Sequence, residues 1–219
     1  MFPLSTFAAL IVAVAAPFAQ SARPPAVDVA RAVQAHYDTV QDFTAEFTHT
    51  YVGGILRKRI TEQGHLQVKK PGRMRWEYTQ PEPKTFVSDG SQMYSYVPAD
   101  RQVYVSPVPA EDQATTAVLF LTGKGSLLRD FDVRYSDEPG GLAGTVALRL
   151  DPKLPERDYD WLELVVDRRT FQIRSFVAAD DQGGTSTFQF RDLQENVGLS
   201  DKTFEFRIPR GVDVIRGGS

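Results

Sequence analysis

The residue types that most often carry out chemistry are sparse in this chain of 219 residues. It contains no cysteine, which excludes thiol nucleophiles, disulfides, cysteine-ligated zinc and iron–sulfur clusters. Its histidines are His36, His49 and His65, and none has a second histidine or a carboxylate at the helical spacing of a metal site. We therefore expect these histidines to be solvated or packed rather than to act as metal ligands or general bases.

Two motifs come close to catalytic signatures. Residues 122–126 (TGKGS) suggest a phosphate-binding loop, but the Walker pattern needs a glycine five residues before the Gly-Lys pair, and residue 118 is valine. No Gly-x-Ser-x-Gly nucleophile elbow occurs. The sequence therefore predicts no catalytic residue, no metal and no cofactor. A hydrolase built on a carboxylate pair stays open, although the acidic residues alternate with apolar ones as on solvent faces.

Charge and composition narrow the class of protein further. Lys and Arg number 25 against 28 Asp and Glu, and this net charge of −3 argues against a nucleic-acid binder, which needs a basic surplus. A hydrophobic content of 42% with 24% charged residues is typical of a folded domain. At this length we expect one domain with a substantial core, and a monomer.

The first 22 residues carry no charged side chain. Their apolar stretch, 7–16, is too short to span a bilayer, and small residues follow it. We interpret residues 1–22 as a signal peptide, with cleavage after Ala19 or Ala22, and residues 23–219 as a single exported domain. The lack of Lys or Arg near the start is atypical, and the alternative is an uncleaved N-terminal helix.

The elements after this leader follow from hydrophobic periodicity. Residues 26–40 have a helical period, which predicts an amphipathic helix. Its apolar stripe consists of Val27, Ala30, Val33 and Tyr37. From Phe43 onward the alternation has a period of 2, which predicts strands. The expected strands lie near 43–51, 66–70, 74–78, 84–88, 92–97, 102–106, 130–135, 145–150, 161–166, 171–179, 185–192 and 204–208. We expect a mainly β fold with additional helices, of the α+β class. In it, about eleven antiparallel strands form a curved sheet or incomplete barrel.

One helix is expected to interrupt the strands. Residues 113–122 follow Asp112, a good N-cap, and precede Gly123, which suits the end of a helix. The helix is apolar all round between 117 and 121, so we expect it to be buried or to cover something apolar. Flanking prolines and glycines favour a mobile lid rather than a fixed core element.

Strand parity gathers large apolar side chains on one face of the expected sheet. These are Phe43, Phe47, Leu66, Val68, Met74, Trp76 and Tyr78. Lys70 ends the same stripe. Two interpretations are open: a filled core between sheet and helices, or an apolar cavity beneath them. Periodicity does not separate these interpretations.

Three segments resemble the LolA family, the periplasmic outer-membrane lipoprotein carriers. They are 40–51 (VQDFTAEFTHTY), 69–98 (KKPGRMRWEYTQPEPKTFVSDGSQMYSYVP) and 206–215 (FRIPRGVDVI). The order of leader, amphipathic helix, strands and apolar helix also matches, and the resemblance spans essentially the whole mature chain.

The resemblance implies an incomplete barrel around a cavity for the acyl chains of lipoproteins, lined by the stripe above. It implies an apolar lid helix that includes Val118, Leu119, Phe120 and Leu121. It also implies a periplasmic, non-enzymatic carrier that is loaded by an ATP-driven inner-membrane complex and unloaded by an outer-membrane receptor. That receptor is anchored through an N-terminal cysteine, which this chain lacks, so the resemblance favours the carrier.

Lys70 stands where many relatives have an arginine that is thought to hydrogen-bond the cover and hold the empty carrier closed. The resemblance therefore implies a lid latch at Lys70, although lysine offers a point charge rather than a planar fork. The alternative is a lysine that reaches solvent at the strand end.

Two other functions remain open at this stage. One is a periplasmic binding module of the same fold for another lipid or a regulatory partner. The other is an enzyme on an open barrel, which would need a convergent polar cluster inside the cavity.

Overall fold

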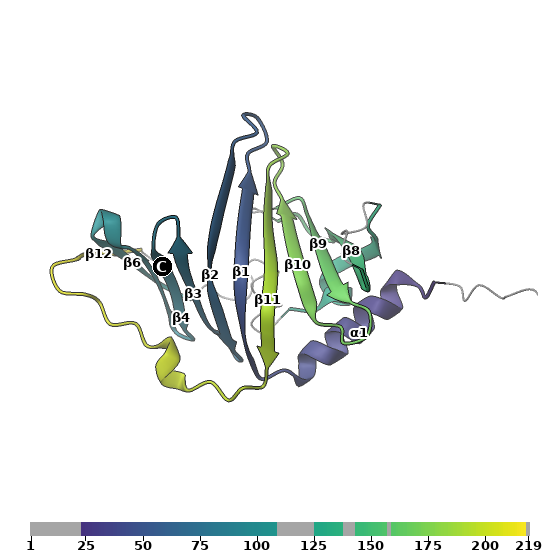
Figure 1. Cartoon of the computed structure of the whole chain (residues 1–219), viewed down its shortest axis with the longest axis horizontal. Helices are drawn as coiled ribbons and strands as arrows, with labels where there is room; N and C mark the ends of the chain where they lie inside the picture. Colours follow the sequence, from purple (N-terminus) through teal and green to yellow (C-terminus); the bar gives the residue numbers. More distant parts are fainter. Residues whose placement is uncertain (1–22, 109–124, 138–142, 157–158, 218–219) are drawn as a thin grey trace, which may run out of the picture.

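The structure, a computed structural model, describes residues 23–108, 125–137, 143–156 and 159–217. Its described strands form one sheet in the order β12-β6-β5-β4-β3-β2-β1-β11-β10-β9-β8-β7 (Figure 1). The strands are β1 Asp42–Val52, β2 Arg59–Lys69, β3 Arg73–Gln80, β4 Lys84–Asp89, β5 Gln92–Val97, β6 Gln102–Pro107, β7 Phe131–Tyr135, β8 Thr145–Pro152, β9 Trp161–Asp167, β10 Ile173–Ala179, β11 Thr185–Glu195 and β12 Asp213–Arg216.

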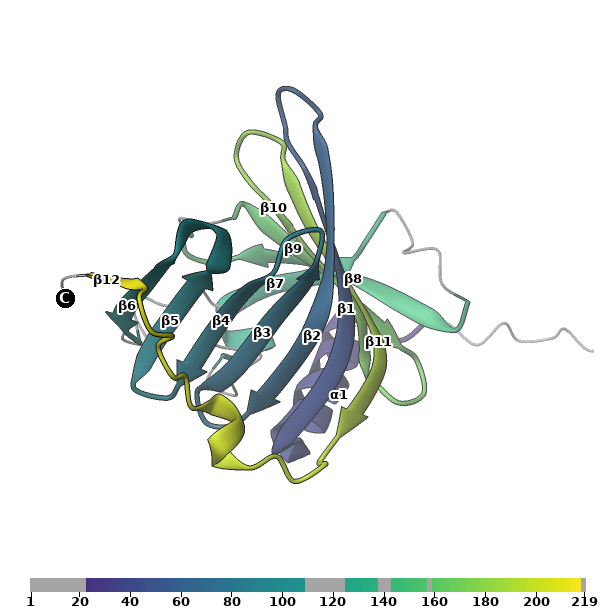
Figure 2. The same ribbon diagram turned by 60° about the vertical axis from the view of Figure 1, so that its left-hand side comes forward.

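The predicted fold class is confirmed. The sheet is strongly curved and does not close into a barrel, since β12 and β7 are its two ends (Figure 2). Consecutive strands pair antiparallel from β1 to β6 and from β7 to β11, and the antiparallel pairing of β1 with β11 joins these two runs. β12 is the exception, because it pairs parallel with β6. The described sheet thus has twelve strands rather than about eleven, and one parallel pair at its edge.

Helix α1 (Ala26–Thr39) agrees with the predicted helix within one residue and packs on one face of the sheet, which we call the inner face. Ala30, Val33 and Tyr37 are buried there. Val27, which the stripe included, is 41% exposed. It lies beside the buried stripe, because Ala26 and Val29 are the apolar residues of the first turn that pack against the core.

Most of the core lies between α1 and the inner face. Leu148, Leu162 and Leu164 are nearly fully buried on β8 and β9, and Phe131 closes this side. A short helix, α3 (Leu127–Asp130), contacts α1 and leads into β7. The sequence expectation had a strand start at Asp130. In the structure the Ser126 hydroxyl caps α3 by accepting from the Arg129 N–H.

The C-terminal segment differs from expectation. Residues 204–208 do not form a strand; the 3-10 helix η2 (Asp201–Phe204) begins a segment that contacts β3 and β4 on the outer face. Phe204 is 1% exposed there, and Phe206 stacks on Tyr94 with ring centroids 5.3 Å apart. The alternation of Phe204 and Phe206 therefore reflects packing on the outer face rather than strand pairing. A second 3-10 helix, η1 (Pro98–Asp100), joins β5 to β6.

Two predicted segments cannot be compared with the structure. The signal peptide 1–22 and the lid helix 113–122, with Val118, Leu119, Phe120 and Leu121, lie outside the described residues. Among the residues that are described, no helix is long and apolar enough to cross a membrane.

Candidate functional site

The predicted apolar stripe lies on the inner face, across three neighbouring strands. The register that joins its members is Phe43–Val68–Met74, Leu66–Trp76 and Phe47–Gly64–Tyr78. Its buried members are Phe43, Phe47, Leu66, Val68 and Tyr78. Met74 and Trp76 are only half-buried and pack against that base. Parity thus places the seven residues correctly on one face, while their role toward an acyl chain stays a prediction.

Aromatic rings from β1, β3 and β11 contact one another on the inner face. The Phe47 ring makes edge contacts with Trp76 and Tyr78, at centroid distances of 5.0 and 4.9 Å. Phe188 of β11, which sequence reasoning missed, lies 5.2 Å from the Trp76 ring. Gly64 makes this cluster possible: a Cβ there would lie 2.8 Å from Phe47 Cζ and 2.0 Å from the Glu77 carbonyl oxygen. The rings are therefore accommodated by a missing side chain on β2.

Several large apolar side chains of the inner face, inside this cluster and around it, are not fully buried. They include Met74, Trp76, Phe86, Phe176 and Phe188. They come from β3, β4, β10 and β11. Half-buried aromatic and thioether side chains adapt to apolar partners of irregular shape.

A polar row borders the aromatic cluster. His49 on β1 lies between Glu62 and Ser186, with Nδ1 3.2 Å from Glu62 Oε2 and Nε2 3.3 Å from Ser186 Oγ. Lys84 Nζ lies 2.7 Å from the other oxygen of Glu62 and 4.2 Å from the centre of the Tyr78 ring. The His49 ring stacks on Phe188 at 4.1 Å. His49 has the same strand parity as Phe43 and Phe47 on β1, and this parity is the one sequence signal that points to this row.

Burial is the main influence on this histidine. Desolvation lowers the pKa of His49, and the nearby Lys84 ammonium acts in the same direction, whereas Glu62 opposes both. A neutral ring satisfies both contacts if Nδ1–H donates to Glu62 and Nε2 accepts from the Ser186 hydroxyl. The packed histidine expected from the sequence is what the structure shows at His49.

The order Glu62–His49–Ser186 matches the connectivity of a hydrolytic triad, so the enzyme interpretation needs a geometric test. Such a triad requires backbone N–H donors beside the serine to hold an oxyanion. Ser186 lies inside a regular strand, paired with Tyr51 on one side and Ala178 on the other. The backbone N–H groups next to Ser186 therefore belong to the hydrogen bonding of the sheet and do not form an oxyanion site. Among the described residues, no three His, Asp or Glu side chains gather as a metal site either.

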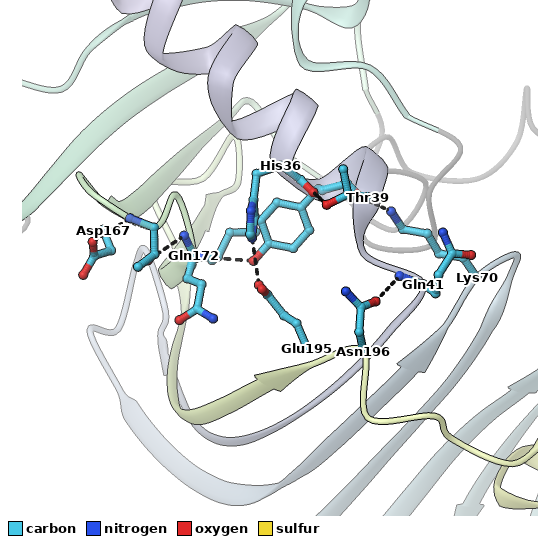
Figure 3. A network of polar contacts seen from close by, with 11 residues as sticks. His36, Thr39, Gln41, Lys70, Asp167, Gln172, Glu195 and Asn196 are labelled. Carbon is cyan, nitrogen blue, oxygen red and sulfur yellow. Dashed lines mark hydrogen bonds and ion pairs between the residues drawn. The ribbon is translucent and has the colours of Figure 1, made fainter.

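Helix α1 is tied to the sheet by polar contacts from several elements (Figure 3). The Tyr37 hydroxyl accepts from the Ile173 N–H at 3.0 Å, and burial raises the pKa of Tyr37. His36 Nε2 lies 3.0 Å from Glu195 Oε1 at the end of β11. Gln34 Oε1 accepts from the Leu127 N–H at 2.9 Å, which joins α1 to α3. These contacts fix α1 over the core.

Lys70 belongs to the same set of contacts. Its Nζ donates to the carbonyl of Tyr37, in the last turn of α1. Desolvation lowers the pKa of the Lys70 amine, and Asp38 partly offsets this. A cation at this position complements the negative end of the helix dipole, and the Tyr37 carbonyl accepts from the Val40 N–H at 3.2 Å as well. The structure thus gives Lys70 a partner on α1, while any contact with segment 113–122 lies outside the described residues.

A separate hollow of about 300 Å³ lies between α1 and the sheet end near β7. Its mainly apolar lining includes Val29, Tyr135, Val146 and Phe171. None of the seven residues predicted to line a cavity contributes to it. The stripe and this hollow are therefore distinct parts of the inner face.

The family follows from a match over most of the chain. A family model described as outer membrane lipoprotein carrier protein LolA matches residues 38–207. The chain belongs to the LolA family. The resemblance drawn from the sequence segments is thereby confirmed, and it places the chain among carriers rather than enzymes.

Individual relatives agree with this family. An outer-membrane lipoprotein carrier protein of Hahella chejuensis is 32% identical, with 81% of this chain and 83% of that protein covered. One from Chromohalobacter salexigens is 28% identical, with 83% of each chain covered. Among solved structures, an uncharacterized conserved protein from Thermus thermophilus has a TM-score of 0.56 at 13% identity, covering 86% of this chain and 99% of that one. This last likeness concerns the fold alone.

Proposed function

We propose that this LolA-family member is a periplasmic carrier that binds the acyl chains of lipoproteins on its inner face and delivers them to the outer membrane. The observation that carries the proposal is the set of half-buried apolar side chains there, Met74, Trp76, Phe86, Phe176 and Phe188. Related proteins named as outer-membrane lipoprotein carriers support lipoproteins as the cargo.

The physical need for such a surface is large. An acyl chain of about fifteen methylenes costs roughly 12 kcal/mol to expose to water, at about 0.8 kcal/mol per CH₂. A carrier must remove most of this cost and still release the chain. An apolar face that is already half-buried meets both requirements, because the empty protein exposes only part of it and cargo completes its burial.

The proposal includes two partners beyond the cargo. An ATP-driven complex of the inner membrane supplies the work of extracting lipoprotein from the bilayer, so the carrier needs no nucleotide site. An outer-membrane lipoprotein receptor with a more favourable cavity accepts the chain. The handover is then downhill between two apolar surfaces.

Two adjacent residues of β10 provide a matched test. Phe176 and Val177 are both half-buried, but Phe176 pairs with Phe188 and Leu164 on the inner face, whereas Val177 pairs with Thr187 and Glu163 on the outer face. Spheroplasts with newly made lipoproteins are incubated with the parent chain, with Phe176→Asp or with Val177→Asp. We expect Phe176→Asp to lower the released lipoprotein about tenfold or more, since it places a charge where acyl chains bind. Val177→Asp should release as the parent does.

Circular dichroism and thermal unfolding of both variants show whether each is folded. Equal release by folded Phe176→Asp and by the parent would contradict binding on the inner face. Failure of the parent to release any lipoprotein would contradict the carrier function itself.

A further inference from the structure

The hairpin between β1 and β2 ends in the two most exposed large aliphatic side chains among the described residues. Ile55 is 80% exposed and Leu56 is 86% exposed. Their loop projects beyond the body of the sheet, together with the neighbouring β10–β11 hairpin, at the end away from α1 (Figure 1). The apolar inner face does not account for these two side chains, so they need an explanation of their own.

Backbone hydrogen bonds and a close packing contact hold the tip of this hairpin in place. The Gly53 N–H donates to the Lys58 carbonyl and the Arg57 N–H donates to the Gly53 carbonyl, both at 3.0 Å. Gly54 lies directly against the β10–β11 turn: a Cβ there would lie only 1.9 Å from the Gln182 carbonyl oxygen. Close contact with a second hairpin therefore holds Ile55 and Leu56 at the apex.

Positive charge follows directly after the apex. Arg57, Lys58 and Arg59 are all exposed, and none of the ion pairs found within the described ranges includes them. The adjoining turn carries Asp180 and Asp181. The Asp180 carboxylate already accepts from the backbone N–H groups of Gln182 and Gly184. The joint tip is thus apolar at its apex and net basic behind it.

We propose that this tip is a docking site for a membrane surface that contains anionic phospholipids. Aliphatic side chains at an apex enter the interface between headgroups and acyl chains, and basic side chains just behind them lie at the level of the phosphates. One weak apolar anchor and one weak electrostatic attraction together give reversible binding, which suits a protein that must leave the membrane again. The inference adds a contact with the bilayer itself to the proposed carriage of lipoproteins and does not depend on it.

Vesicle sedimentation tests the proposal on the full chain, after mass spectrometry has shown that no lipid is bound. The parent should sediment with phosphatidylglycerol vesicles more than with phosphatidylcholine vesicles, and salt should weaken the preference. Ile55→Ser combined with Leu56→Ser should lower the affinity about tenfold or more. Asp181→Asn should raise binding to phosphatidylglycerol, because it removes a like charge beside the tip. Leu154→Ser is the matched control: Leu154 is 77% exposed on the β8–β9 connection, and its loss should change nothing.

Absence of parent binding would overturn the proposal and would direct attention to a protein partner. Equal binding by the parent and the double variant, equal binding to both lipids, or an equal loss in Leu154→Ser would also overturn it. A direct probe uses the lack of native cysteine. A bimane label on Leu56→Cys should shift to shorter wavelength on phosphatidylglycerol vesicles, and one on Leu154→Cys should not. An unshifted label at position 56 would contradict insertion.

Discussion

Trp76 and Trp161 lie on opposite faces of the sheet, so each reports on a different surface. Trp76 is half-buried on the inner face, in edge contact with Phe47 and Phe188. Trp161 lies under the Arg149 guanidinium, whose central carbon is 3.7 Å from the ring centre. Arg149 pairs with Arg134 and Glu163 and belongs to the polar outer face.

This arrangement yields a fluorescence prediction. In a Trp161→Phe background, saturating lipoprotein should shift the emission of Trp76 to shorter wavelength, because an acyl chain excludes the water that reaches a half-buried indole. In a Trp76→Phe background the same cargo should leave the emission of Trp161 unchanged. An unshifted Trp76 spectrum with bound cargo would remove Trp76 from the acyl site.

The polar row predicts a pH dependence of stability at His49. Burial lowers its pKa below the ordinary value of 6.5, so the unfolded chain takes up a proton at a higher pH than the native state does. The stability that His49 contributes is therefore present above pH 6.5 and decreases as the pH falls toward its lowered native pKa. Glu62 and Lys84 are the charged groups that face it, and Tyr78 lies nearby.

The measurement is the free energy of unfolding by urea between about pH 7.5 and pH 5.5 for the parent and for His49→Gln. Glutamine keeps a donor and an acceptor but does not titrate. The parent should lose stability more steeply on acidification than the variant, so the difference between them should shrink. His36 is present in both proteins and cancels in the comparison. Parallel curves would show that His49 titrates alike in both states.

At the scale of elements, Lys70 tethers the last turn of α1 to the end of β2. Lys70→Met keeps the aliphatic stem and removes the donor to the Tyr37 carbonyl. We expect a loss of about 1–2 kcal/mol in unfolding free energy, and faster amide hydrogen exchange in the last turn of α1. Lys69→Met is the control, because Lys69 binds the Leu199 carbonyl and Asp201 instead. It should loosen residues near 199–201 and leave α1 protected; equal exchange in α1 for both variants would contradict a specific tether.

Sequence periodicity located most elements because burial on one face imposes it. The apolar stripe from Phe43 to Tyr78 could be predicted from the sequence, because each of its residues follows strand parity. The role of Gly64 was not predicted, because it depends on the exact register of β2 with β1 and β3. The role of Phe188 was not predicted, because it depends on the pairing of β11 with β1, which is distant in the sequence. Phe204 and Phe206 alternate like a strand while packing on the outer face. β12 has only Val214 and Ile215 as apolar residues, and its parallel partner lies more than one hundred residues earlier.

The whole molecule is a sheet covered from both sides. α1 lies on the inner face, and the segment around Phe204 packs on the outer face over β3 and β4. That segment then carries the chain to β12, which pairs with β6. The outer covering and the edge strand are thus one continuous C-terminal stretch, and it determines which backbone groups remain available at that end of the sheet.

This arrangement predicts what happens when the edge is uncovered. The Asp213 N–H donates to the Arg101 carbonyl and the Gly217 N–H donates to the Val105 carbonyl, both at 2.9 Å. A chain shortened to end at Gly211 keeps Phe204 and Phe206 in place but leaves the backbone groups of β6 unpaired. An unpaired strand edge recruits another strand. We expect the parent to be monomeric and the shortened chain to form dimers as its concentration rises, as measured by light scattering during gel filtration. The full chain with Val214→Ser and Ile215→Ser is the control, because it keeps the main-chain pairing and should stay monomeric. A shortened chain that remains monomeric at the same concentrations would show that β12 is not needed to protect β6.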